Sequence, residues 1–449
     1  MKTPIIDFVE NYKKKDAIRL HMPGHKGKSF LGFESLDITE IEGADVLYSA
    51  NGIIEESQNI ASELFGTRTT LYSCEGSSLS IRAMLYLAVL TSNMPTKTIL
   101  AGRNAHKAFM NSAAMLDFDI EWLYPAEGSV LSCEISEEQL DKKLSSMSEK
   151  PVAVYITSPD YLGNVADIES IAKVCHKYDV LLLCDNAHGA YRHFLKKSQH
   201  PIALGADMCC DSAHKTLPVL TGGGYLHINK KAPDILSKNA KKAMSLFAST
   251  SPSYLILQSL DMANKYLSEG YIQDLEFCTR RVKMLKESLK HKGFELVGNE
   301  ELKITIAPKS YGYTGVDIAK YLESNNIFCE FYDQDFTVMM FTREITSADF
   351  DKIENALLCL IKKPQITVEA PKYIPGKRLM SVRKAVFSPS EVIDTEKSLG
   401  KILAKDSVSC PPAIPIAVCG EEINKSAIDL FNYYGITEVE VVADITYEL

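Results

Sequence analysis

The chain has 449 residues, of which 46% are hydrophobic and 24% charged, and its formal net charge is -9. This length predicts two or three domains, and the composition is typical of a soluble globular protein. The acidity and the lack of a Lys/Arg tract argue against a nucleic-acid-binding protein. No stretch resembles a signal peptide or a membrane span. The 11 cysteines are scattered without a Cys-x-x-Cys pair, so we expect buried thiols, no metal site and a cytoplasmic location.

The first 55 residues do not have the pattern of a folded domain. Helical spacing of Ile5, Phe8 and Tyr12 predicts one short helix, and a turn-rich stretch from His21 to Gly27 follows it. Residues 37–52 are acidic and irregular. We expect residues 1–55 to be an arm that lies over another surface, such as a second subunit.

Strands and helices alternate from about residue 56. The pattern predicts strands at 69–73, 98–101, 151–156, 180–184, 206–210 and 225–228, and helices at 58–65, 79–90, 108–116 and 167–178. Such alternation indicates an α/β fold with a mostly parallel sheet.

The second half of the chain begins with a helical stretch. We expect one long helix over 258–291, then a smaller α/β region with strands at 302–307 and 336–341 and helices at 315–324 and 347–361. The predicted division is an arm of residues 1–55, a large domain of residues 56–291 and a C-terminal part of residues 292–449.

Polar residues gather where the predicted strands end, which is where parallel sheets bind ligands. Lys215 follows one such strand and lies between hydroxyl residues and a glycine run. That position suits an amine that forms a Schiff base with a carbonyl, although a surface lysine is the simpler interpretation. Strand ends also carry Ser77, Ser78, His106, Asp160, Asp185, His188, Ser212 and His214.

Gly76, Ser77 and Ser78 open a predicted helix directly after a strand. Backbone N–H groups and the helix dipole at such a position bind phosphate, although an ordinary serine N-cap is an alternative. Together with a lysine, a buried acid and an imidazole, this pattern favours pyridoxal phosphate (PLP). A dinucleotide site is not favoured, because no Gly-x-Gly-x-x-Gly loop joins a strand to a helix.

The sequence resembles the Orn/Lys/Arg decarboxylases, PLP-dependent enzymes of the aspartate-aminotransferase fold, in their short form. The motifs that carry the resemblance are His21-Met22-Pro23-Gly24-His25-Lys26, Asp37-Ile38-Thr39-Glu40, Gly76-Ser77-Ser78, Arg103-Asn104-Ala105-His106-Lys107, Asp185-Asn186-Ala187-His188-Gly189, Ser212-Ala213-His214-Lys215, Ser249-Thr250-Ser251-Pro252, Cys410-Pro411-Pro412-Ala413-Ile414-Pro415 and Gly420-Glu421.

The resemblance implies a role for each matching residue. Lys215 would carry the Schiff base, Asp185 would pair with the pyridine nitrogen, and His106 would stack on the ring. His188 would lie near the ring hydroxyl and the substrate carboxylate. The phosphate would be held by Gly76, Ser77, Ser78, Ser212, His214 and, from a partner subunit, Thr250. The implied assembly is a homodimer with active sites at the interface.

Several positions depart from the family pattern. Asn186 stands where Glu is usual, and Glu75, Ala108, Gly222, Cys410 and Ala413 are further departures. None of them removes Lys215, Asp185 or His188, so the chemistry stays credible and the substrate is left open.

The activity that the resemblance implies is α-decarboxylation of a basic amino acid, with arginine giving agmatine and CO2 as the leading case. Lysine or ornithine decarboxylation is the first alternative. A PLP aminotransferase is another, and its substrate carboxylate would need an arginine such as Arg343, Arg378 or Arg383. A PLP-binding regulator without catalysis is the alternative from outside the enzymes.

Overall fold

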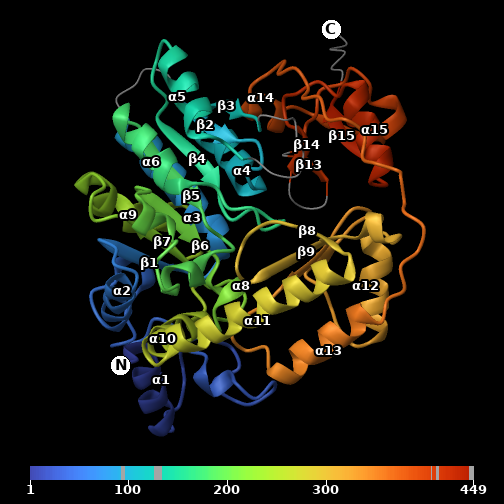
Figure 1. The fold of residues 1–449 in the computed structure, drawn as a ribbon. Coiled ribbons are helices and arrows are strands. Elements are labelled where there is room, and N and C mark those ends of the chain that lie inside the picture. Colours follow the sequence, from blue (N-terminus) through green and yellow to red (C-terminus); the bar gives the residue numbers. More distant parts are fainter. Residues whose placement is uncertain (93–96, 126–133, 406, 411–413, 444–449) are drawn as a thin grey trace. The chain divides into compact units, whose positions relative to one another are not determined.

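The computed structural model of the chain describes residues 1–92, 97–125, 134–405, 407–410 and 414–443, and Figure 1 colours its elements along the chain. Two compact units are present, which we describe separately. The first comprises Met1–Met94, Val152–Ile156 and Ile168–Asp274, and the second comprises Pro95–Pro151, Thr157–Asp167 and Leu275–Leu449. Within the residues described, none of the helices combines the length and the apolarity needed to cross a membrane.

The first unit contains most of the elements that carry predicted site residues. Its elements are α1 (Pro4–Lys14), η1 (Glu34–Leu36), η2 (Leu47–Ser49), α2 (Ile53–Leu64), β1 (Thr69–Ser73), α3 (Gly76–Thr91), β4 (Ala153–Thr157), α6 (Ile168–Lys177), β5 (Leu181–Asp185), η3 (Ala190–Phe194), α7 (Pro201–Leu204), β6 (Met208–Asp211), α8 (Ala213–Thr216), β7 (Gly224–Ile228), α9 (Asp234–Phe247) and α10 (Tyr254–Ser268).

The second unit contains the remaining elements. They are β2 (Thr98–Gly102), α4 (Lys107–Leu116), β3 (Asp119–Leu123), α5 (Glu137–Ser146), α11 (Tyr271–Lys292), β8 (Glu295–Val297), β9 (Lys303–Ala307), η4 (Pro308–Tyr311), α12 (Gly315–Ser324), β10 (Phe331–Tyr332), β11 (Thr337–Met340), α13 (Ser347–Leu358), α14 (Val382–Val386), β12 (Ser390–Asp394), η5 (Thr395–Lys397), β13 (Ser407–Cys410), β14 (Ile414–Val418), α15 (Lys425–Tyr433) and β15 (Glu438–Val442).

Seven strands form one mixed sheet in the order β1-β7-β6-β5-β4-β2-β3. Strand β5 is parallel to β6, and β2 is parallel to β3. Strand β7 is antiparallel to both β6 and β1. Strands β5, β6 and β7 are almost wholly buried, as strands covered on both faces are. The predicted α/β class with a mostly parallel sheet is confirmed.

Most predicted strands and helices of the large sheet are present within a few residues of their predicted bounds. The long helix predicted over 258–291 is wrong, because α10 ends at Ser268 and α11 begins at Tyr271. Gly270 lies between them with φ +80°, a backbone conformation that ends a helix and favours glycine. Strand β3 is present although its sequence pattern did not predict it.

A four-stranded antiparallel sheet in the order β10-β11-β9-β8 lies in the second unit. Helix α12 packs beside β10 and β11. Thr314 and Asp317 form a capping box at the start of α12, and Thr346 and Asp349 form one at the start of α13. Both boxes satisfy backbone N–H groups that a helix start leaves unpaired, so the two helices begin where the local sequence directs.

The N-terminal helix α1 is held to the rest of the first unit by a buried carboxylate. Asp261 of α10 accepts hydrogen bonds from the backbone N–H groups of Ile5 and Ile6 at 3.0 and 3.1 Å, and from the Ser57 hydroxyl. Burial raises the pKa of Asp261 to about 6, although the hydrogen bonds oppose that shift. The start of the chain is therefore tied to this unit through its backbone.

A buried ion pair joins two predicted family motifs in the second unit. The Arg103 guanidinium contacts both oxygens of Glu421 at 2.9 and 2.7 Å, and its Nε donates to the Tyr373 hydroxyl at 3.1 Å. Both charged side chains are almost wholly buried. Burial alone would lower the pKa of Arg103, but the Glu421 carboxylate outweighs it and raises the pKa. The pair keeps its charges inside the protein because each satisfies the other.

We expect the Glu421→Gln substitution to lower the free energy of unfolding by about 3–5 kcal/mol, because it leaves the Arg103 charge buried without its partner. Chemical denaturation measures this loss. The matched control is Glu422→Gln at the half-buried neighbouring position, which we expect to change the free energy by no more than about 0.5 kcal/mol. Equal effects of the two substitutions would contradict the prediction.

Candidate functional site

Lys215 lies in the short helix α8, four residues after strand β6 ends at Asp211. Its Nζ atom is 3.1 Å from Nε2 of His188, which is in the loop that follows β5. Lys215 is half-buried and His188 is buried. The structure therefore brings together the predicted lysine and one predicted imidazole within hydrogen-bonding distance, at the carboxyl ends of two neighbouring parallel strands.

Asp185 is the last residue of β5 and is buried. One carboxylate oxygen accepts a hydrogen bond from the Tyr155 hydroxyl at 3.0 Å, and the other accepts from the backbone N–H of Ala187 at 3.2 Å and contacts the Cys210 thiol at 3.5 Å. Burial and the nearby Asp185 charge raise the pKa of Tyr155, so this phenol stays a hydrogen donor. Each of these partners of Asp185 is electrically neutral.

The neutral partners of Asp185 determine which ligand would suit this position. A buried carboxylate is costly unless a positive charge or several donors balance it. A protonated pyridine nitrogen supplies both a positive charge and an N–H donor. The donors around Asp185 therefore fit the ring of PLP, which is the group that the resemblance implies for this residue.

Gly76, Ser77 and Ser212 form a second cluster in the same unit. The Ser212 hydroxyl donates to Ser77 Oγ at 2.8 Å, and the Gly76 N–H donates to the Gly222 carbonyl at 2.6 Å. Gly76 has φ +66°, a conformation that glycine adopts without strain. Helix α3 has no side-chain cap at its N-terminus, so this cluster has the polar groups and the helix dipole that phosphate binding requires.

The glycine run from Gly222 to Gly224 packs tightly against this cluster. A Cβ atom on Gly224 would lie 2.8 Å from the carbonyl oxygen of Asp211 and 3.1 Å from a backbone carbon of Gly76. One on Gly222 would lie 2.9 Å from the carbonyl oxygen of Cys74. These glycines allow β7 to approach the segment before Lys215, a role that the sequence pattern does not reveal.

The remaining predicted cofactor residues have different surroundings. Ser78 is half-buried in the first turn of α3, and His214 Nδ1 lies 2.9 Å from the Gly223 carbonyl oxygen. Thr250 is exposed, next to Ser249, whose N–H donates to Glu75 at 2.7 Å. The hydrogen bond therefore holds the Thr250 segment close to the start of α3.

His106 belongs to the second unit, where it is the N-cap residue of α4. Its Nδ1 accepts a hydrogen bond from the Ala108 N–H at 3.2 Å, and its side chain is exposed. Its stacking on the cofactor ring stays a prediction. Two of the arginines considered for an aminotransferase are engaged in this unit: Arg378 donates to Asp119 and Ile120, and Arg383 donates to the Ala114 carbonyl.

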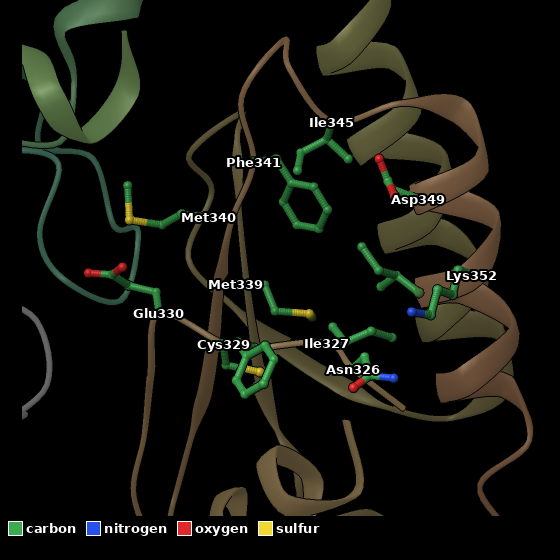
Figure 2. Close-up of a pocket in the computed structure, with 12 residues that line it drawn as sticks. Asn326, Ile327, Cys329, Glu330, Met339, Met340, Phe341, Ile345, Asp349 and Lys352 are labelled. Atoms are coloured by element: carbon green, nitrogen blue, oxygen red, sulfur yellow. The ribbon is translucent and has the colours of Figure 1, made fainter. Parts of the chain in front are cut away.

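A pocket of about 340 Å³ lies in the second unit between the segment Asn326–Glu330, strand β11 and helix α13. Figure 2 shows Met339 and Phe341 directed toward its interior, with Asp349 and Lys352 on the helix side. Lys352 is exposed, whereas Lys215 is half-buried beside His188. Schiff-base chemistry needs a lysine that transfers its proton to a neighbouring group, so we place the candidate site at Lys215.

Tyr155 is a partner of Asp185 that sequence reasoning missed, although it lies inside a predicted strand. The residue type offered a signal, because a tyrosine inside the apolar run of β4 needs a partner for its hydroxyl. A second feature that was missed is the group of His200, His227 and Asp211 around the end of β6. Those histidines are separated in sequence and follow no recognised spacing.

Comparison with known proteins places this arrangement in a family. Residues 3–306 match the family described as "Orn/Lys/Arg decarboxylase, major domain". An arginine decarboxylase of Bacillus subtilis is 30% identical over 462 residues, covering 95% of this chain and 92% of the relative. An arginine decarboxylase of Halalkalibacterium halodurans is 30% identical over 457 residues, with the same coverage of each chain.

Solved structures share the fold. The constitutive lysine decarboxylase of E. coli has a TM-score of 0.77 and 18% identity, covering 98% of this chain and 82% of that chain. Lysine decarboxylase A of Pseudomonas aeruginosa has a TM-score of 0.80 and 16% identity, covering 98% and 80%. The match to the family over two thirds of the sequence and the near-complete coverage of the curated relatives lead to one conclusion: the chain belongs to the Orn/Lys/Arg decarboxylase family.

Proposed function

We propose that this protein is a PLP-dependent decarboxylase that converts arginine to agmatine and CO2. The observation that carries the proposal is Lys215 beside His188, next to a buried Asp185 whose partners are neutral. The family and the two arginine decarboxylases at 30% identity support the substrate. Lysine and ornithine are the alternative substrates, and a polyamine or its precursor is the product in each case.

Each predicted residue has a defined task in this proposal. Lys215 would hold the cofactor through its amine, which must lose a proton before it acts as a nucleophile. His188 Nε2, at 3.1 Å, is placed to accept that proton. When bound, PLP supplies an electron sink for the electrons released as the bond to the carboxylate breaks. Either Lys215 or His188 can then return a proton to the substrate carbon.

Asp185 and the serine cluster would hold the two ends of the cofactor. The Tyr155 hydroxyl and the Ala187 N–H fix the orientation of the Asp185 carboxylate, which would hold the ring nitrogen. Because Ser212 donates its hydroxyl hydrogen to Ser77, the Ser77 hydroxyl keeps its own hydrogen for a phosphate oxygen. Gly76, Ser78 and His214 belong to the same proposed phosphate site, and His106 is proposed to stack on the ring.

We also propose that the protein is a cytoplasmic homodimer. Ile18, Leu20, Phe30 and Leu31 of the N-terminal arm have exposed fractions of 77–90% in the single chain. Exposed apolar side chains in one segment are commonly covered by a partner, and the resemblance implies that Thr250 of one copy reaches the phosphate bound by the other. Buried thiols such as Cys175 and Cys209 are typical of a reducing compartment.

The substrate proposal predicts release of CO2 from arginine, with a kcat/KM at least about tenfold higher than for lysine or ornithine, because discrimination by a recognition pocket is typically that large. Parallel assays with carboxyl-labelled arginine, lysine and ornithine measure it. Higher turnover of lysine or ornithine would show that one of these amino acids, and not arginine, is the substrate. Transamination of the same amino acids without CO2 release would indicate an aminotransferase, and PLP binding without turnover would indicate a regulator.

The assignment of Lys215 predicts that Lys215→Ala removes the visible absorbance band of the purified protein, because no amine remains to hold the cofactor covalently. Borohydride treatment followed by peptide mass spectrometry should place the reduced cofactor on Lys215 in the native protein. Lys238→Ala, at an exposed position of α9, is the control and should keep the band. An unchanged band in Lys215→Ala would show that another lysine holds the cofactor.

The homodimer proposal predicts that Phe30→Asp weakens the dimer, because a charge would be buried against apolar surface in the interface. Sedimentation equilibrium of the native protein and the variant measures the change, which we expect to be at least about tenfold in the dimer dissociation constant. Phe328→Asp is a matched control, since the exposed fractions of Phe30 and Phe328 are 78% and 79%. A monomeric native protein would contradict the proposal.

A further inference from the structure

A buried polar network surrounds the end of strand β6 in the first unit. The Asp211 carboxylate is fully buried, and one oxygen accepts a hydrogen bond from the Asn186 side-chain amide at 2.7 Å. The other oxygen lies 3.1 Å from His200 Nε2 and 3.2 Å from His227 Nε2. We call these four side chains the Asp211 network. They come from β6, β7, the loop after β5 and the residue before α7.

The hydrogen bonds assign the protons of this network. Burial alone would raise the pKa of Asp211, but the imidazoles of His200 and His227 outweigh it and hold the pKa low. Burial lowers the pKa of His227 against the opposing effect of Asp211, which favours the neutral ring. Its Nδ1 lies 2.8 Å from the Thr70 hydroxyl, which donates to it, and its Nε2–H donates to Asp211. Asp211 is therefore a carboxylate held by N–H donors from three side chains.

A metal site is the alternative interpretation of this region, because donor atoms of His200, Cys209 and Asp211 lie within 4.8 Å of one another. A metal bound at His200 Nε2 would move the ring proton to Nδ1. That atom is buried and has no hydrogen-bond partner among the residues that the structure describes, whereas a metal-bound histidine donates its other N–H. The hydrogen-bonded network accounts for these atoms better than a metal does.

The Asp211 network joins the two segments that carry the proposed chemistry. Asn186 directly follows Asp185, and Asp211 directly precedes Ser212. The Asn186 N–H also donates to the Cys210 carbonyl at 3.0 Å, and the Lys215 N–H donates to the Ser212 carbonyl at 3.0 Å. The hydrogen bond from the Asn186 amide to Asp211 therefore fixes the end of β5 beside the end of β6.

The amide at position 186 and the acid at position 211 depend on each other. An aspartate at position 186, which has nearly the same shape as asparagine, would face the Asp211 carboxylate at hydrogen-bonding distance. Two buried carboxylates that close cannot both be ionised, so one takes up a proton or they move apart. Asn186 removes the repulsion and supplies the donor that Asp211 requires.

We propose that Asp211 and Asn186 form an acid–amide pair that positions Asp185 and Lys215 for the cofactor. The proposal rests on the proposed function for the identity of the cofactor. Asp211 is a positioning residue in this assignment, because it acts through the strand ends and does not touch the reacting atoms. His200 and His227 hold its second oxygen, so its first oxygen faces the Asn186 amide.

An exchange of acid and amide tests the pair. Asn186→Asp places two carboxylates together, and Asp211→Asn places two amides together. Asp211→Asn combined with Asn186→Asp restores one acid and one amide, and the amide oxygen then placed on β6 still faces the two imidazoles. We expect each single variant to raise the dissociation constant of added PLP at least about tenfold, and the double variant to return it to within about threefold of the native value.

Two further measurements separate positioning from simple loss of stability. The pH midpoint of the visible band of the PLP-bound protein should shift by about one unit in the single variants and return in the double variant. Asn229→Asp is the control, because Asn229 is a buried amide of the same unit that donates to the Ile202 and Ala206 carbonyls. It should lower the unfolding temperature without changing PLP affinity.

The outcomes decide between the possibilities. Single variants that lose only thermal stability, or a double variant that is no better than the singles, would overturn the inference. One equivalent of zinc in the native protein, lost in Asp211→Asn, would also overturn it in favour of a metal site. A native protein that binds PLP and follows the predicted exchange but releases no CO2 would overturn the proposed function and leave the acid–amide pair standing.

Discussion

Two buried carboxylates, Asp185 and Asp211, end neighbouring strands of the central sheet, and the first unit is arranged to tolerate them. Charges inside a protein are costly unless donors or opposite charges surround them. Asp211 has an amide and two imidazoles. Asp185 has a phenol, a backbone N–H and a thiol, all neutral. Asp211 is therefore satisfied within the protein, whereas Asp185 is the acid that we propose to hold the cationic ring nitrogen.

Burial of the Asp211 carboxylate depends on the close approach of the β7 backbone to β6. Strand β7 turns antiparallel to β6 and begins with Gly224, at a point where a side chain would collide with Asp211 and Gly76. The same approach brings His227 to the Asp211 carboxylate. The glycine run is therefore required for packing beside the site. This packing explains the glycines without any role in phosphate binding.

Local patterns in the sequence predicted the sheet and the strand ends well. Apolar runs such as residues 180–184 end abruptly in polar residues, and that contrast located Asp185, His188 and Lys215. The partners of these residues were not predictable in the same way. Tyr155, His200 and His227 reach the two acids only after the strands pair, and nothing in their spacing indicates that contact. The break at Gly270 was missed because apolar spacing on both sides is compatible with one helix.

Family motifs also differ in what they contribute. Arg103 and Glu421 belong to two motifs that are far apart in sequence, yet they form a buried bidentate pair with each other. The two charges neutralise each other in that pair, so neither side chain is available to bind a substrate. Asp185 is different, because the donors that contact its carboxylate are neutral groups. A charged residue of a family motif therefore suggests ligand binding where its partners do not neutralise its charge, and tertiary contacts decide whether they do.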